Sequence, residues 1–178
     1  MKFLQSLLLA MIFVSCNDSS SEEKTEIIIP PAPASVEKIQ ASLRQSHYSI
    51  KDIGFVYSFM GKEEPAEWAS QMKDTSTHFK NFVGGRKKFE LNFINDSTVH
   101  LKEEGEAIEA LYELEKDTSN VISLLIQFED ESFSFPGATE PMVMTYTYKI
   151  EGINDDHLYL EAPREYNRKK VMYMMKKL

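Results

Sequence analysis

Residues 88–102 read KFELNFINDSTVHLK, and this stretch decides the fold. Apolar residues occupy every second position of two runs, 89–93 and 99–101, and Asn95-Asp96-Ser97 separates the runs. Alternation with a period of two indicates a strand with one buried face. A polar turn between two such runs indicates a β-hairpin.

The same pattern recurs along the chain. A second hairpin is predicted over residues 108–128, with its turn at 117–120, and a third over 142–160, with its turn at 154–156. A strand at 53–59 precedes these hairpins and a strand at 169–175 follows them. Eight closely spaced strands predict a mainly β fold, an eight-stranded antiparallel up-and-down barrel.

Two segments depart from this alternation. Ser35 is a suitable N-cap for a short amphipathic helix whose apolar stripe comprises Val36, Ile39 and Leu43. Residues 65–83 predict a second helix, because Pro65 suits a first helical position and Gly84-Gly85 suits a helix end. Its apolar face would comprise Trp68, Met72, Phe79 and Val83. A long loop over the barrel mouth is the alternative.

The N-terminus carries an export signal. Lys2 precedes an apolar run at 7–14, and Ser15 and Cys16 end it before a polar stretch begins. The run is too short for a transmembrane helix, which needs about 20 apolar residues. A signal that ends on a lone Cys resembles the bacterial lipoprotein signal. That resemblance implies that residues 1–15 are removed and that Cys16 is lipidated.

A lipidated Cys16 would hold the protein to a membrane through palmitate-type acyl chains, because two or more chains make attachment stable. Residues 16–34 read as a flexible tether rich in Ser and Pro, followed by one domain over 35–178. Glu22-Glu23 loosely resembles the signal that sends Bacteroidetes lipoproteins to the outer leaflet. The expected location is therefore the cell envelope, more specifically the outer membrane, with surface exposure left open.

The net charge of the chain excludes some classes of binding partner. The formal net charge is -8, and removal of residues 1–15 deletes one basic residue, Lys2, and no acid, which gives -9. An acidic domain is a poor partner for nucleic acid or for anionic lipid. Cys16 is the only cysteine, which excludes an internal disulfide and a zinc-thiolate site.

Several short segments resemble the lipocalin-like domains of small Bacteroidetes lipoproteins: residues 93–99 (FINDSTV), 146–153 (YTYKIEGI) and 157–160 (HLYL). The likeness covers roughly residues 50–178. Gly54 is followed by Phe55-Val56 rather than completing the Gly-x-Trp of classical lipocalins, and residues 61–86 form a long first connection. The resemblance implies a lipocalin-like barrel.

Such a barrel can hold a small ligand or be packed solid. We expect a non-enzymatic binder of a small apolar or amphipathic ligand. The candidate contacts combine aromatic or Met character with expected inward or mouth placement; they are Tyr57, Trp68, Tyr112, Met144, Tyr146 and Tyr148. Met and Tyr residues of 172–175 are further candidates for the lining. The alternative is an interaction module with a packed barrel that engages another envelope protein.

No motif with catalytic or metal-binding spacing is present. The four histidines, His47, His78, His100 and His157, lack metal-site spacing, and no nucleophile elbow supports a hydrolase. The acidic run at 102–106 reads as a solvated turn rather than a cation loop. We therefore expect no enzyme, no metal and no cofactor. Asp96-Ser97-Thr98 resembles the O-glycosylation acceptor of Bacteroidetes exported proteins, which makes Ser97 a candidate glycosylation site.

Overall fold

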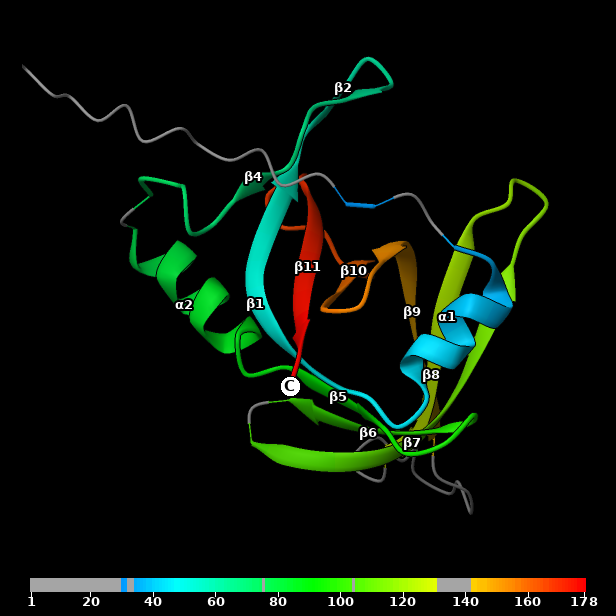
Figure 1. The fold of residues 1–178 in the computed structure, drawn as a ribbon. Coiled ribbons are helices and arrows are strands. Elements are labelled where there is room, and N and C mark those ends of the chain that lie inside the picture. Colours follow the sequence, from blue (N-terminus) through cyan, green and yellow to red (C-terminus); the bar gives the residue numbers. More distant parts are fainter. Residues whose placement is uncertain (1–29, 32–33, 75, 104, 131–141) are drawn as a thin grey trace, which may run out of the picture.

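Eight of the described strands form a closed antiparallel barrel (Figure 1). The computed structural model describes residues 30–31, 34–74, 76–103, 105–130 and 142–178, so Cys16, the expected signal peptide and most of the expected tether lie outside the described residues. The barrel strands are β1 (His47–Val56), β5 (Glu90–Phe93), β6 (Thr98–Glu103), β7 (Glu106–Lys116), β8 (Ile122–Asp130), β9 (Met142–Ile153), β10 (His157–Glu161) and β11 (Lys170–Lys177). Neighbours in this order pair antiparallel, and β11 pairs with β1 to close the barrel. The predicted fold is confirmed.

In each of the three predicted turns, the side chain of an Asn or Asp accepts hydrogen bonds from backbone amides. The side chain of Asn95 accepts hydrogen bonds from the backbone amides of Ser97 and Thr98, at 2.9 and 2.8 Å. Asp117 and Asn154 cap the other two turns in the same way. Asn and Asp favour such turns because their side chains replace a backbone acceptor. All three turns lie at one end of the barrel, since each follows a strand that runs in the same direction.

Helix α1 (Val36–Leu43) covers that end. The Ser35 side chain accepts a hydrogen bond from the Lys38 amide, and Ile39 and Leu43 are buried in the barrel core, as the sequence predicts. The side-chain amide of Gln40 donates to the Tyr112 hydroxyl at 2.9 Å, and that hydroxyl donates to the Asn95 carbonyl at 2.9 Å. These bonds close the end of the barrel.

The segment between β1 and β5 differs from the predicted helix over residues 65–83. It comprises a hairpin of β2 (Ser58–Phe59) and β3 (Lys62–Glu63), then β4 (Glu67–Trp68), and only then α2 (Thr77–Arg86). Ser76 rather than Pro65 precedes the helix, and its side chain accepts a hydrogen bond from the Phe79 amide. Gly84 and Gly85 lie inside α2. The first strand also starts earlier than predicted, at His47, and ends at Val56.

Strand β4 lies on the outer wall of the barrel. It pairs with β1 at Gly54 and Phe55, and Trp68 packs on the outside with Val56, Tyr159, Met172 and Met174. The register of β1 shifts between Ile50 and Asp52, and the buried Asp52 carboxylate accepts hydrogen bonds from the amide and hydroxyl of Ser70, which follows β4.

This outer cluster corrects the expected lining of the last strand, because only Val171, Tyr173 and Met175 of β11 belong to the interior core. Among the described helices, none is long and apolar enough to cross a membrane.

Candidate functional site

Helix α2 covers the end of the barrel opposite α1. Phe79 and Phe82 project from it onto Phe55 of β1 and Tyr166 of the β10–β11 connection, with ring centroids 5.5 Å apart for Phe55–Phe79 and 4.2 Å apart for Phe82–Tyr166. Aromatic pairs at these separations are favourable beyond their burial. The long first connection therefore closes most of the mouth.

A cavity remains beneath α2. Its volume is about 140 Å³. Its walls come from α2, the end of β6, β9, β11 and the β10–β11 connection, and they comprise Phe82, Arg86, Glu103, Tyr146, Tyr148, Ala162, Pro163, Arg164, Glu165 and Tyr173. Drug-sized ligands occupy sites of about 300–1,000 Å³, so this cavity suits only a small ligand or the head of a larger one. The rest of the interior holds one continuous apolar core.

Three tyrosines line the inner wall of this cavity. Tyr146 and Tyr148 lie on the inward face of β9, and Tyr173 lies on β11. Tyr148 and Tyr173 are both only 4% exposed, and the side chains of all three tyrosines border the cavity. Burial raises the pKa of Tyr148 well above 10.0 and also raises the pKa of Tyr173. The hydroxyls of Tyr148 and Tyr173 are therefore protonated donors at neutral pH.

An ion pair forms the outer wall. The guanidinium of Arg86 donates to the Glu103 carboxylate at 2.6 Å, and it lies 5.8 Å from the centre of the Phe82 ring. Both side chains are about one-third exposed, so the pair is hydrated on one side and contributes little to stability. Tyrosine hydroxyls, a guanidinium and an aromatic ring together can hold a small group that accepts hydrogen bonds and has an apolar side.

The structure brings only part of the expected contact set together. Tyr146 and Tyr148 line the mouth cavity, and half-buried Met144 follows on the same face of β9. Tyr112 lies at the opposite end of the barrel, where its hydroxyl is hydrogen-bonded to the Gln40 side chain and the Asn95 carbonyl. Tyr57 is 43% exposed next to the β2–β3 hairpin.

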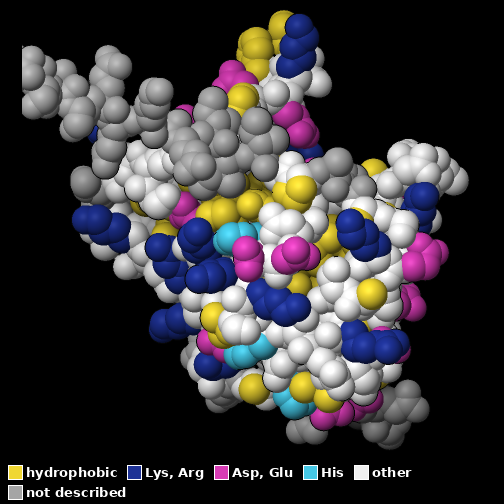
Figure 2. All heavy atoms as spheres, in the orientation of Figure 1, with side chains coloured by type: hydrophobic (Ala, Val, Ile, Leu, Met, Phe, Trp, Pro, Cys, Tyr) yellow, Lys and Arg dark blue, Asp and Glu magenta, His cyan; other side chains and the backbone are white. Residues whose placement is uncertain are grey.

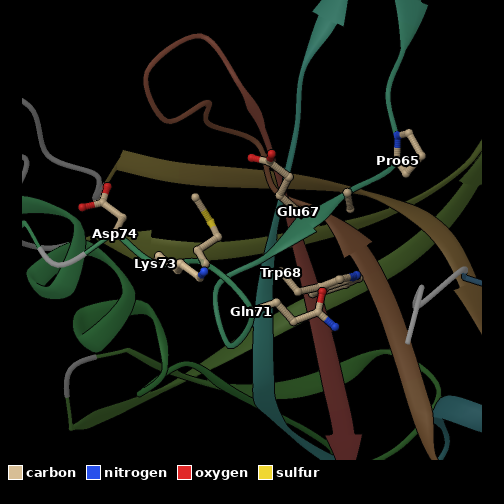
Figure 3. A pocket seen from close by; sticks show the side chains of 8 residues that line it. Pro65, Glu67, Trp68, Gln71, Lys73 and Asp74 are labelled. Carbon is tan, nitrogen blue, oxygen red and sulfur yellow. The ribbon is translucent and has the colours of Figure 1, made fainter. Parts of the chain in front are cut away.

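Trp68 lies outside the barrel, next to an open groove of about 530 Å³. The side chains that line this groove belong to residues 65–68 and 71–74 (Figure 3). The groove is larger than the mouth cavity, but one short surface segment supplies all of its walls. The mouth cavity unites five elements and buried polar groups, and we therefore take it as the candidate site.

Sequence reasoning missed Arg86 and Glu103 as members of this site, whereas Tyr173 was among the expected lining residues of 172–175. Arg86 follows Gly84-Gly85, which suggested the end of a helix, and Glu103 belongs to the acidic run that suggested a solvated turn. Arg86 ends α2 and Glu103 ends β6, so their opposite charges could have suggested an ion pair. That inference requires knowing that α2 lies over the mouth of the barrel. Nothing in the spacing of these residues indicates that placement.

The other sequence candidates lie apart from this cavity. His47 pairs with Glu90 at 3.1 Å, His100 lies 3.6 Å from Glu109, and His78 stacks on Tyr166. Among the described residues, no group of three or more His, Cys, Asp or Glu side chains could hold a metal ion. Ser97 is exposed in the β5–β6 turn, where the Asn95 side chain accepts from its hydroxyl at 3.2 Å. Neighbouring Asp96 pairs with Arg44 rather than forming the turn itself.

Comparisons with protein-family models, curated proteins and solved structures give no match to this chain. The lipocalin-like family assignment therefore stays a prediction.

Proposed function

We propose that this chain is a lipid-anchored cell-envelope lipoprotein whose lipocalin-like barrel binds a small amphipathic ligand at its mouth, without catalysis. One observation carries the ligand site: Tyr146, Tyr148 and Tyr173 from two strands and the Arg86 guanidinium from α2 converge on one cavity at the barrel mouth. Ligand sites typically combine an apolar lining with a small number of converging polar groups of this kind.

The cavity defines the chemistry of the ligand. Its hydroxyls donate to a carboxylate, carbonyl or hydroxyl group, while Phe82 and Ala162 offer apolar contact. The volume of about 140 Å³ admits a compact head group. An acyl tail would have to leave the cavity between α2 and the β10–β11 connection, because buried side chains fill the barrel below it.

The ligand site is tested by NMR titration of straight-chain carboxylic acids, from acetate to octanoate, and of the matching alcohols. We expect chemical-shift changes at Tyr148 and Tyr173 and an affinity that falls about tenfold in the Tyr148→Phe/Tyr173→Phe variant. Tyr57→Phe is the matched control, because Tyr57 lies outside the cavity. Equal affinity in wild type and the double variant would refute the site.

The lipid anchor rests on the sequence around Cys16 and on the acidic composition, which provides no electrostatic attachment to anionic lipid. Treatment of cells with globomycin, which blocks lipoprotein signal processing, should cause a precursor to accumulate. The Cys16→Ala variant should leave the membrane fraction. Membrane retention of that variant without any precursor would exclude lipidation.

A further inference from the structure

The outer wall of β7, β8 and β9 exposes aliphatic side chains. Leu111 is 61% exposed and Val143 is 60% exposed, and both point away from the barrel core. They flank a groove of about 380 Å³ whose lining is Glu109, Ala110, Leu111, Gln127, Phe128, Glu129 and Val143. A smaller groove of about 210 Å³ adjoins it and shares Leu111 and Gln127. Half-buried Leu125 lies on the same face, opposite Glu113.

The same wall is acidic. Its outward-facing glutamates are all exposed: Glu109, Glu113, Glu115 and Glu129. Among the described outward-facing residues of β7 and β8 there is no Lys or Arg, and Glu113, Glu115 and Glu129 form no salt bridge with a described residue. By contrast, positive and negative side chains are interspersed on the face that Figure 2 shows. We call the surface of Leu111, Leu125, Val143 and the four glutamates the acidic apolar wall.

Charge selects among the molecules that could cover this wall. Anionic lipid and nucleic acid would meet four carboxylates, of which only Glu109 has a basic partner, His100. A second copy of the chain would bring glutamates against glutamates in a protein with a formal net charge of -8. A protein segment that presents Lys or Arg between aliphatic residues would satisfy both the charge and the apolar groove.

We propose that the acidic apolar wall docks a basic, aliphatic segment of another envelope protein. Strands β7, β8 and β9 are paired on both sides, so the segment cannot add a strand to the sheet and must be recognised through side chains. Its aliphatic side chains would lie between Leu111 and Val143, with its cations beside Glu113 and Glu129. This surface is separate from the mouth cavity, and its use does not depend on the proposed ligand.

The test is the affinity of a fluorescein-labelled peptide in which Leu and Lys alternate, measured by fluorescence anisotropy. Two peptides serve as comparisons: one with Ser in place of Leu, which matches the charge, and one with Glu in place of Lys, which matches the apolar content. Leu111→Ser/Val143→Ser should weaken binding of the Leu-Lys peptide about tenfold or more, because burial of both aliphatic side chains is lost. Glu113→Lys/Glu129→Lys should weaken binding and flatten its salt dependence.

The control variant is Phe59→Ser/Met60→Ser, which removes exposed apolar side chains from the β2–β3 hairpin and should leave the affinity unchanged. All of these substitutions replace exposed side chains, so folding is retained. Equal binding of the Leu-Lys and Ser-Lys peptides, or equal weakening by the hairpin variant, would overturn the proposal. A dimer in analytical ultracentrifugation that Leu111→Ser disperses would also overturn it, since a second copy would then cover the wall.

Discussion

Trp68→Ala should destabilise the barrel strongly, although Trp68 lies outside it. The side chain is 1% exposed and packs against Met172, Met174 and Tyr159 across the outer wall. Gly54 permits this close packing, since a Cβ at that position would lie 3.2 Å from the indole ring. Truncation of a buried Trp costs about 3–5 kcal/mol, a large part of the about 5–15 kcal/mol that holds a typical domain folded.

Urea unfolding followed by circular dichroism measures this loss, because the signal does not depend on the indole that the mutation removes. Trp68→Phe should retain most of the stability, and Tyr57→Ala should stay within about 0.5 kcal/mol of wild type, because Tyr57 is partly exposed. In the wild type, the single tryptophan should resist quenching by acrylamide. A decrease of less than about 1 kcal/mol in the free energy of unfolding of Trp68→Ala would refute the reasoning, because the expected cost assumes that the indole is buried in the cooperatively folded structure.

Three further predictions concern other parts of the chain. Gly152→Ala should displace Pro31, because a Cβ at position 152 would lie 2.2 Å from the Pro31 carbonyl oxygen. We expect faster proteolysis before residue 35 and an unchanged melting temperature of the barrel. Unchanged proteolysis would contradict this prediction. The hydrogen bond from Arg44 lowers the pKa of Asp96 below its ordinary 3.8, so the stability that Asp96 contributes is present above pH 3.8 and is lost as pH falls through the folded-state pKa. The difference in urea midpoint between wild type and Asp96→Asn should therefore shrink as pH falls over that range. A difference that stays constant with pH would be inconsistent with the Arg44–Asp96 pair. Because burial raises the pKa of Tyr148 and Tyr173 above 10.0, their contribution to stability is present below pH 10.0 and is lost as pH rises above it. The absorbance of tyrosinate should show a component that ionises at higher pH than the rest and that Tyr148→Phe/Tyr173→Phe removes. Ionisation of all tyrosines near pH 10 in the folded protein would count against the burial of these two.

The strands could be predicted because their physics is local. Alternation at 89–93 and 99–101 and the side-chain acceptor of Asn95 determine a hairpin without reference to the rest of the chain. The connection from Tyr57 to Lys88 could not be predicted in the same way. Apolar residues from Trp68 to Val83 fit a helical period, but Trp68 instead pairs with Gly54 in a short strand, where a distant part of the sheet buries it.

Of the candidate site, only the tyrosines of β9 and β11 were predictable from the sequence. Tyr146 and Tyr148 follow from the inward face of β9, whose alternation is visible in the sequence. Arg86 and Glu103 enter the site because α2 lies over the mouth, and that depends on the fit of Phe79 and Phe82 against Phe55 and Tyr166. Such packing between distant segments leaves no periodic signal in the sequence.

Native mass spectrometry of the protein, purified in mild detergent from its own cell envelope, tests the central claim most directly. Wild type should carry a small bound molecule at a stoichiometry near one, and the Tyr148→Phe/Tyr173→Phe variant, prepared identically, should lose it. Tyr57→Phe should retain it. A wild-type protein without any bound molecule, or a bound molecule that the double variant retains fully, would contradict a ligand site at the barrel mouth.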